Sequence, residues 1–573
     1  MKTMNDNNQP TIRKIARIRD DATGQYSEIV EFPISDSTTA RLELAPAVIH
    51  DLRQFADKLL NAGAILPKDV TEQKELLRAV ADSDAPKEFV YAAETGWLND
   101  ECKVFVKADG VIGNSDTNII GINPVQDVKD QSGHLSIAGT WETWKTSVAQ
   151  KARLSSISMF AICVALAAPL LRIIGHQSFS ICIFGRTRIG KTFATLIGAS
   201  VRGIGQKEDL IAWNITDDRL EQRLVEYNDS VFPIDDLMKM RGSKKDKHVR
   251  IEDIAYLIEQ GHQKGRHCSF AKAHGAARKW RAILFTSNEQ SVAELAQGLG
   301  LERRHGATVR LIDVPGQIDG LDHIFDRLKE SMEIATFHDW MHTQFTEIAR
   351  DCAQNHGAAF DRYIKGLIFY GCATVTKCAR NQIKLFLSNV IEETDGSIAR
   401  DVAHNYGLIY AGGMLGIQTG ILPWTKEELL DGVTKCYLAA RELLPDEGVA
   451  LRRGIPALRE RLRQLPSLSS LPIGKTAKGH YENVDGYWKR ESGMYRCIIK
   501  CDAFNSIFSS TYECNLALNW LIRKGQIALA VSKTATPGSE PRLKKQHEWP
   551  DGERHRSYEI CWPRKSKTDD IAK

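Results

Sequence analysis

One stretch, FSICIFGRTRIGKTFATLIGASV at residues 179–201, limits what this chain can fold into more than any other part of the sequence. A mostly apolar, β-prone run is followed by a loop that fits G-x-x-x-x-G-K-[ST], and then by a helix-forming run. In such a strand-loop-helix unit, loop N–H groups and the positive end of the helix dipole face a bound phosphate. The pattern predicts an ATP site in which Lys191 reaches the β- and γ-phosphates and the Thr192 hydroxyl is a ligand of Mg²⁺. The predicted phosphate-binding residues are Gly185, Arg186, Thr187, Arg188, Ile189, Gly190, Lys191 and Thr192.

A second strand supplies the acidic residues that such a site needs. In SVFPIDDL, an apolar run ends at Asp235, which would hold the metal through water, and Asp236, which would orient the attacking water. Glu is the usual residue at the second position, and Asp is one methylene shorter. Pro233 is also unexpected, because it removes a ladder hydrogen bond from what should be a central strand. An acidic turn after a strand is the alternative interpretation.

Three further polar residues follow in the order that an ATPase core would require. Asn288 ends the strand-like run WRAILFTSNE, where its amide could contact the γ-phosphate or the attacking water. Arg303 and Arg304 precede the next expected strand, where oligomeric ATPases place an arginine finger that reaches a neighbouring subunit's nucleotide. The alternative interpretation is that Asn288 only forms a turn and that the two arginines are only solvated. What favours a role in an ATPase is that these residues follow the phosphate loop and the acidic strand in the expected order.

The expected strands and helices indicate an α/β fold of the AAA+ type. Strand and helix signals alternate through the region of the phosphate loop and then give way to helices alone. This order predicts a P-loop AAA+ core with a five-stranded parallel sheet and a helical lid. The expected strands are 179–184, 210–214, 231–234, 282–287 and 308–314.

The block GHQKGRHCSFAKAHGAARKWR, residues 261–281, is basic and contains no acidic residue. The whole chain has a net charge of only +4, so any surface for nucleic acid must be a local patch such as this one. A solvated basic loop is the alternative. The predicted nucleic-acid contacts in this block are Lys264, Arg266, Lys272 and Arg278.

The C-terminal region reads as a separate small domain. Residues 497–534 predict two helices followed by a strand, and SYEICWP predicts a returning strand, which together make the winged-helix plan. The intervening wing would carry Lys544 and Lys545, which are suited to phosphate contacts. The expected organisation is an N-terminal region of unknown role (1–85), a β-rich module (86–141), the ATPase core (142–324), the helical lid (325–463), a linker (464–484) and the winged helix (485–573).

Several features predict a cytoplasmic protein without a membrane segment. The twelve cysteines form no CxxC pair, which is typical of free thiols in a reducing compartment. The N-terminus lacks the apolar core of a signal peptide. The run Met159–Leu171 is too short to span a bilayer, so a buried helix is expected there.

The segments ETGWLNDECKVFVKADG, NITDDRLE, PIDDL, EQGHQKGR and KWRAILFTSNE, together with the phosphate loop, resemble the domain-of-unknown-function family number nine hundred and twenty-seven. The resemblance covers residues 89–315. Members occur in prophages and other mobile elements, and some are similar to minichromosome-maintenance helicases, which are ring-forming AAA+ ATPases that unwind DNA. The resemblance implies a hexameric ring on single-stranded or forked DNA, with the basic block as a hairpin that grips the DNA backbone in the channel.

These observations leave three functional hypotheses. The leading one is an ATP-driven DNA motor of a mobile element, to which a primase or polymerase on another chain could be coupled, since this chain shows no such site. The second is a nucleotide-dependent switch or defence sensor that binds ATP and nucleic acid without unwinding. The third is a site-specific regulator that binds through the winged helix and uses the ATPase core only to oligomerise.

Overall fold

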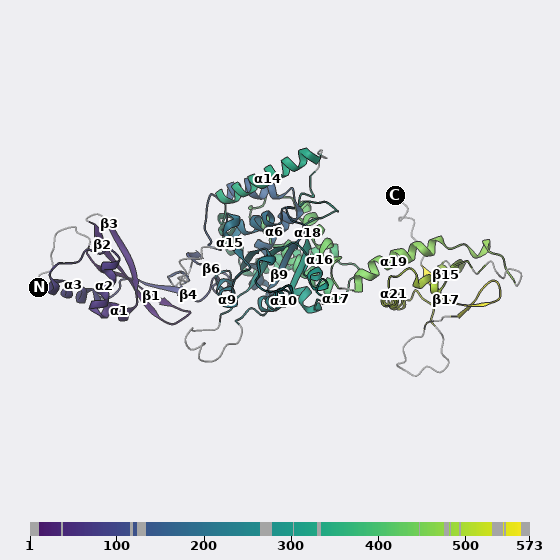
Figure 1. The fold of residues 1–573 in the computed structure, drawn as a ribbon, viewed down its shortest axis with the longest axis horizontal. Coiled ribbons are helices and arrows are strands. Elements are labelled where there is room, and N and C mark those ends of the chain that lie inside the picture. Colours follow the sequence, from purple (N-terminus) through teal and green to yellow (C-terminus); the bar gives the residue numbers. More distant parts are fainter. Residues whose placement is uncertain are drawn as a thin grey trace, which may run out of the picture. The chain divides into compact units, whose positions relative to one another are not determined.

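The fold is described from a computed structural model in which the chain forms two compact units (Figure 1). The first unit contains residues 1–390 and 401–443, and the second contains residues 391–400 and 444–573. The structure describes residues 11–35, 38–114, 118–122, 133–263, 278–301, 303–328, 334–445, 447–474, 481, 483–491, 494–529, 543 and 546–562.

The N-terminal sheet is built from both sides of the boundary expected at residue 85. Its strand order is β3-β2-β1-β4-β8, and β4 and β8 continue the sheet in parallel from β1. Phe32, Phe55 and Leu77 are buried in the core that this sheet shares with three helices. A separate antiparallel sheet, β5-β6-β7, follows along the chain. The elements are β1 (Arg13–Asp20), β2 (Tyr26–Ser35), β3 (Thr38–Leu44), α1 (Pro46–His50), α2 (Leu52–Asn61), α3 (Val70–Ala81), β4 (Glu88–Ala92), β5 (Gly96–Trp97), β6 (Val104–Lys107), β7 (Gly110–Gly113) and β8 (Ile119–Ile122).

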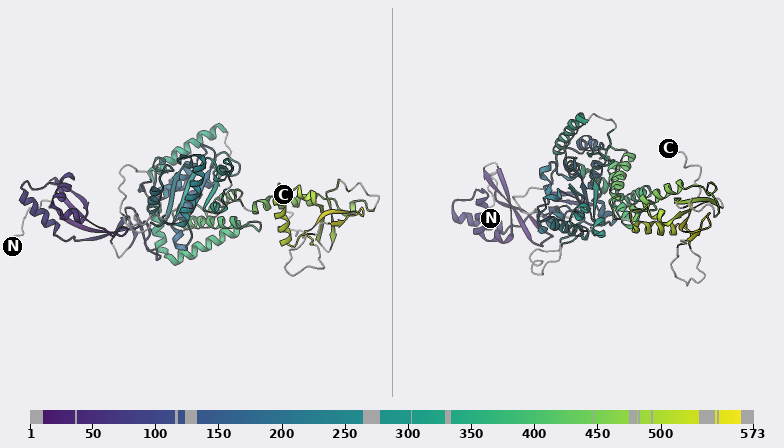
Figure 2. Two further views of the ribbon diagram at one scale, coloured as in Figure 1. Left: turned by 60° about the horizontal axis from the view of Figure 1, so that its bottom comes forward. Right: turned by 45° about the vertical axis from the view of Figure 1, so that its right-hand side comes forward.

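The expected five-stranded parallel sheet is confirmed. Its order is β10-β11-β12-β9-β13, every pairing is parallel, and helices flank the strands (Figure 2). The strands are β9 (Phe179–Phe184), β10 (Ile211–Ala212), β11 (Ser230–Asp235), β12 (Ala282–Asn288) and β13 (Leu311–Pro315).

Two strands differ from the sequence-based expectation by more than one residue at one of their limits. Residues 210–214 form a strand only at β10, and the last strand begins at Leu311 because α13 (His305–Arg310) precedes it. The Arg310 guanidinium donates to the Gly306 carbonyl at 2.7 Å, so a side chain closes this helical turn onto its own backbone.

The position of Pro233 has a simple explanation in the pairing of β11. β12 pairs with β11 along residues 230–234, whereas β10 pairs only with Ile234 and Asp235. At Pro233 the strand therefore has a single strand neighbour among the described residues, and proline is tolerated where one side of a strand is unpaired.

A fully buried helix, α6, lies beside the sheet. Every residue of α6 (Ser156–Ala167) is buried, which confirms the expectation for the apolar run. Within the described residues, no helix is long and apolar enough to cross a membrane. The neighbouring helices are α4 (Trp141–Trp144), a π-helical turn (Lys145–Ala149), α5 (Gln150–Ala152), α7 (Leu170–Ile174), α8 (Lys191–Arg202), α9 (Asp217–Glu226), α10 (Lys244–Gln260) and α12 (Val292–Gln297).

The helices after β13 are shared between the two units. α19 buries Leu451, Ile455 and Leu458 in one core with Phe504 and Leu521 of the second unit. The compact units thus divide the expected lid, 325–463, because its residues 391–400 and 444–463 belong to the second unit. The helices are α14 (Ile334–Gln354), α15 (Ala358–Tyr370), α16 (Cys372–Val390), α17 (Ser397–Gln418), α18 (Lys426–Arg441) and α19 (Glu447–Gln464).

The second unit has an antiparallel sheet of order β14-β15-β17-β16, with two helices between β15 and β16. The strand expected directly after the second helix is present only as single bridges, Ile527 with Ile560 and Leu529 with Leu543. The elements are β14 (Gly486–Glu491), β15 (Met494–Lys500), α20 (Cys501–Asn505), α21 (Thr511–Arg523), β16 (Gln546–Glu548) and β17 (Arg554–Trp562).

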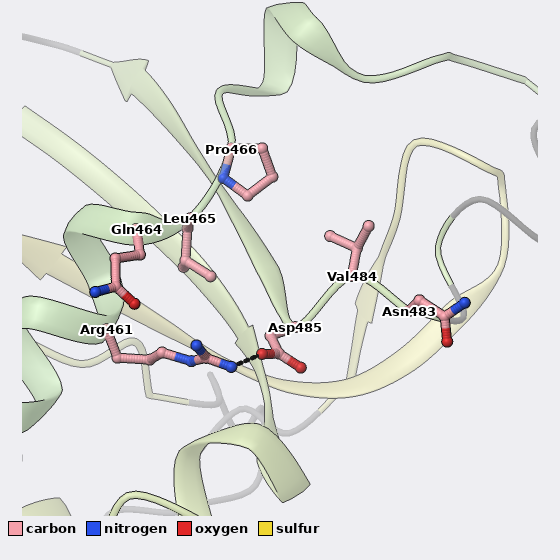
Figure 3. Close-up of a pocket in the computed structure, with 7 residues that line it drawn as sticks. All are labelled: Arg461, Gln464, Leu465, Pro466, Asn483, Val484 and Asp485. Atoms are coloured by element: carbon pink, nitrogen blue, oxygen red, sulfur yellow. Dashed lines mark hydrogen bonds and ion pairs between the residues drawn. The ribbon is translucent and has the colours of Figure 1, made fainter.

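Both ends of the expected linker, residues 465–466 and 483–484, line a hollow together with Arg461 of α19. Arg461 of α19 forms an ion pair with Asp485, just before β14 (Figure 3). The hollow between them, lined also by Pro466 and Val484, has a volume of about 210 Å³. That volume is below the roughly 300 Å³ at which small-molecule sites begin, so it is not a candidate site.

Gly412 of α17 gives a test of how closely the helices around α6 pack. A methyl group there would lie 2.6 Å from the Ala167 backbone nitrogen, whereas at Gly432 of α18 the nearest atom would be 3.6 Å away. Gly412→Ala is expected to lower the melting temperature, because an overpacking cost of about 1–3 kcal/mol exceeds the gain of about 1 kcal/mol in helix propensity. Gly432→Ala is the matched control and is expected to leave the melting temperature unchanged or raised. Equal shifts in calorimetry would contradict this packing.

Candidate functional site

The predicted phosphate loop has the expected strand-loop-helix form. β9 ends at Phe184 and α8 begins at Lys191. Between them Gly185, Arg188 and Gly190 have positive φ angles of 151°, 68° and 112°. Gly185 and Gly190 take such angles at little cost, whereas Arg188 does so at a cost. A loop of this conformation suits an anion, because it can direct successive N–H groups to one point.

Lys191 lies on this loop and is largely removed from solvent. Its Nζ donates to the carbonyl oxygens of Gly185 and Arg186, both at 2.7 Å. Burial lowers the pKa of the ammonium, and the carboxylates of Glu289, Asp236 and Asp235 act against that shift. A partly desolvated cation at a curled loop is a strong binding partner for an anion.

Asp235 ends β11 beside the loop. Its Oδ1 accepts a hydrogen bond from the Ser287 hydroxyl at 2.9 Å, and its Oδ2 is 3.1 Å from the Lys239 ammonium. The carboxylate is buried but remains on the wall of the cleft described below. Together with the Thr192 hydroxyl on the same cleft, it offers the oxygen donors that Mg²⁺ prefers, so the residues present fit this ion.

Asp236 holds an unusual backbone conformation. Its φ of 58° is in the left-handed region, which costs a non-glycine residue about 1–3 kcal/mol. Its Oδ1 accepts a hydrogen bond from the Met238 N–H at 3.0 Å. The Asp236 side chain lines the cleft, although its Oδ1 is occupied by the hydrogen bond from Met238.

The sheet order brings Asn288 to the centre of the site. β12 lies between β9 and β11, so the end of β12 lies between the phosphate loop and Asp235. The Asn288 amide nitrogen donates to the Gln290 carbonyl at 2.7 Å. Its side-chain oxygen is buried and has no hydrogen-bond partner among the described residues.

One cleft of about 550 Å³ joins these residues, a volume within the range of small-molecule sites. It brings together the predicted Lys191, Thr192, Asp235, Asp236 and Asn288. Its lining consists of Thr187, Arg188, Gly190, Lys191, Thr192, Phe193, Asp235, Asp236, Lys239, Ser287, Asn288, Glu289, His338, Met341, His342 and Phe345.

The sequence-based prediction missed two kinds of residue that line the cleft: residues that closely follow a predicted site residue, and residues of α14. Glu289, whose carboxylate accepts a hydrogen bond from the Thr187 hydroxyl at 2.6 Å, directly follows Asn288 and could have been suspected from that position. Lys239 likewise closely follows the acidic pair. The residues of α14 carry no such signal, because they come from a helix far along the chain.

The two arginines predicted as fingers have different surroundings. The Arg303 guanidinium is buried and donates to Asp313 Oδ2 at 2.7 Å and to the Leu311 carbonyl. Burial raises the pKa of the Asp313 carboxyl, and Arg303 opposes this shift. Because its head group is held inside the subunit to which it belongs, Arg303 is not proposed as an arginine finger. The Arg304 side chain is 62% exposed, with an ion pair to Glu252 at 3.3 Å, and remains the candidate.

The basic block begins and ends in an antiparallel stem. The Gln263 N–H donates to the Arg278 carbonyl at 3.0 Å, and the Trp280 N–H donates to the Gly261 carbonyl at 2.9 Å. Lys264, Arg266 and Lys272 lie outside the described residues. The Arg278 guanidinium is 3.1 Å from the Asp218 carboxylate of α9, so this predicted contact already has a partner in the chain.

Asn228 and Asp229 fix this stem to the base of the sheet. The Arg281 N–H donates to Asn228 Oδ1, and the Asp229 N–H donates to the Arg281 carbonyl, both at 2.6 Å. Asp229 Oδ2 also accepts the Trp97 N–H at 3.0 Å. Burial raises the pKa of Asp229 to about 7, against a smaller opposite effect of the Trp97 hydrogen bond. The stem is thus tied both to β11 and to β5.

Comparison with known proteins gives two findings. Residues 8–281 match the family described as Domain of unknown function (DUF927). The match therefore begins before the segments that carry the resemblance and ends before β12. Among sixteen solved chains that match is the active helicase Cch of SCCmec type IV, with a TM-score of 0.51 and 14% sequence identity over 96% of this chain and 93% of that chain. At this identity the likeness concerns the fold. No curated protein matches the chain.

The two arginines can be separated by their effect on stability. Arg303→Met is expected to lower the free energy of unfolding by about 3–5 kcal/mol, because it leaves the buried Asp313 carboxylate without its partner. Arg304→Met removes an ion pair whose arginine side is 62% exposed, and the buried Glu252 carboxylate keeps its hydrogen bond from the Arg304 N–H at 3.2 Å. The expected cost is therefore smaller, about 1 kcal/mol. Urea unfolding of the two variants measures the difference, and a comparable cost for both would contradict the structural role of Arg303.

Proposed function

We propose that the chain is an ATP-driven, DNA-translocating motor, a ring-forming replicative-type helicase of a mobile genetic element or prophage. The observation that carries this proposal is the single cleft in which Lys191, Asp235 and Asn288 meet at the carboxyl edge of a parallel sheet. Open parallel sheets bind ligands at this edge. The likeness in fold to a solved helicase of a mobile element and the match to the DUF927 family support it.

The phosphate end of the cleft suits ATP. The loop residues Gly185, Arg186, Thr187, Arg188, Ile189 and Gly190 would supply N–H groups to the phosphates, and Lys191 would exchange its two carbonyl partners for phosphate oxygens. Thr192 and Asp235 would hold Mg²⁺, which neutralises charge on the β- and γ-phosphates when it is bound.

Hydrolysis needs a positioned water molecule and a group that responds to the γ-phosphate. Asp236, at the end of β11, would accept a proton from the water or orient it. The buried Asn288 side-chain oxygen has no partner among the described residues and could accept a hydrogen bond from the same water. Arg304, whose side chain is 62% exposed, would complete the site of a neighbouring subunit in a homo-oligomer, the hexameric ring that the resemblance implies.

Contact with DNA would be electrostatic and independent of sequence. Lys264, Arg266 and Lys272 lie in the sequence between the two sides of the stem, and their charges match a phosphate backbone. Lys544 and Lys545, outside the described residues, would add phosphate contacts in the second unit, whose two helices and antiparallel strands suit a winged helix. The proposed setting is the cytoplasm, with single-stranded or forked DNA as the partner and a primase or polymerase on another chain as a compatible addition.

A nucleotide-dependent switch is the second candidate, and Asp236 is the observation that favours it. This residue is shorter than the usual Glu, and one of its oxygens accepts the Met238 N–H. If that hydrogen bond persists with nucleotide bound, hydrolysis would be slow and ATP would serve to assemble a complex on nucleic acid.

ATP hydrolysis with and without single-stranded DNA tests the motor. The parent chain is expected to hydrolyse ATP faster with DNA, and Lys191→Ala is expected to lose hydrolysis because it loses phosphate contacts. Lys264→Ala/Arg266→Ala is expected to show no increase on addition of DNA, since its grip on the backbone is weakened.

The matched control for charge is Lys74→Ala/Arg78→Ala, two exposed basic residues on α3. This variant is expected to keep the response to DNA. A parent chain whose hydrolysis is negligible, or the same with and without DNA, would exclude the motor and favour the switch.

A further inference from the structure

One face of α14 lines the cleft. His338, Met341, His342 and Phe345 all line the cleft, and their spacing of three and four residues places them on one side of the helix. α14 follows the sheet in sequence and packs against α8, the helix that begins at Lys191. The lining therefore has a polar part at the sheet edge and an aromatic part that includes rings of α14.

The aromatic part of the lining contains two stacked rings. Phe193 and Phe345 lie nearly parallel, with ring centroids 4.4 Å apart and an interplanar angle of 8°. Phe345 also contacts the buried Phe325, at a centroid distance of 5.3 Å and an interplanar angle of 31°. Phe193 and Phe345 are both half-buried, so their rings are partly open to the cleft.

This ring pair has a fixed place relative to the phosphate loop. A Cβ on Gly190 would be 2.7 Å from the Phe345 ring, so the ring lies directly against the last glycine of the loop. The Ile324 N–H donates to the Ile189 carbonyl at 3.2 Å, and the Asp326 carboxylate accepts hydrogen bonds from the Ser156 N–H and hydroxyl, both at 2.7 Å. The segment that carries Phe325 is thus attached both to the loop and to the start of α6.

The phosphates of a bound nucleotide would use only part of the lining. With the γ-phosphate at Asp236 and Asn288 and the β-phosphate on the loop, the sugar and the base would lie against lining residues that the phosphates leave free. Phe193, which directly follows Thr192, and Phe345 of α14 supply the phenyl rings of that lining.

We infer that Phe193 and α14 form the base subsite, in which the base of a nucleoside triphosphate stacks against the Phe193–Phe345 pair. The exposed His338 and His342 would stand at the rim, where they can donate or accept hydrogen bonds at the base edge or the ribose. This inference rests on the proposed nucleotide function, and it assigns base recognition to a helix outside the phosphate-loop sequence.

The test compares the affinities of Mg·ATP and of Mg·tripolyphosphate by isothermal titration calorimetry. Tripolyphosphate offers the same phosphate chain without sugar or base. Phe345→Ala is expected to weaken Mg·ATP binding about tenfold, because the base loses an aromatic ring on which to stack, and to leave tripolyphosphate affinity unchanged. Phe345→Leu, which retains apolar volume, serves if the Ala variant does not fold, and the same selective loss is expected.

Two controls complete the design. Phe345→Trp keeps an aromatic face and is expected to retain Mg·ATP affinity within a few-fold. Phe337→Ala removes another ring of α14, one that stacks on Trp340 at 5.7 Å and is outside the lining of the cleft, and is expected to change neither affinity.

The outcomes separate this inference from the proposed function. Unchanged Mg·ATP affinity in Phe345→Ala and Phe345→Leu, or an equal loss for ATP and tripolyphosphate, would overturn the base subsite while the nucleotide function stands. A parent chain that binds neither ligand, or binding that persists undiminished in Lys191→Ala, would instead overturn the nucleotide function on which the inference rests.

Discussion

The parallel pairing of β9 with β12 on one side and β13 on the other is the constraint on which the rest of the first unit depends. Strands that run in one direction end at one edge, so polar residues that follow buried strands meet there. This pairing brings Asn288 next to the phosphate loop, and the pairing of β12 with β11 brings Asp235 to the same edge. The common direction of the strands thus places a cation, a carboxylate and an amide in one cleft.

The same strands join the cleft to the stem of the basic block. β11 begins next to Asn228 and Asp229, and β12 begins next to Arg281, at the edge opposite to the cleft. The stem is held there by two backbone-involving hydrogen bonds of 2.6 Å to these residues. In the proposed motor, a movement of Asp235 or Asn288 in response to the γ-phosphate would be transmitted to the stem through β11 and β12, which are short and buried.

The sequence predicted those parts of the site whose chemistry is local. The phosphate loop and the acidic strand were predictable because a few adjacent residues contain both the conformation and the function. Arg303 could not be assigned correctly, because its role is set by the buried Asp313 on a strand that forms only in the folded sheet. α14 was predictable as a helix but not as a wall of the cleft, since Phe345 reaches Phe193 only through tertiary packing. The division of the helices between two units depends likewise on the core that α19 shares with α21, which helical periodicity alone does not reveal.

The measurement that tests the central claim most directly is strand separation of a forked DNA duplex with ATP and Mg²⁺, followed by fluorescence of a labelled strand. Asp236→Asn is the informative control, because it keeps the phosphate loop and loses the carboxylate proposed to orient water. The account predicts that the parent chain separates the fork only with ATP, and that Asp236→Asn binds ATP but does not separate it. Two results would contradict the account. One is ATP hydrolysis that DNA stimulates without any separation of the fork. The other is separation of the fork by Asp236→Asn as efficiently as by the parent chain.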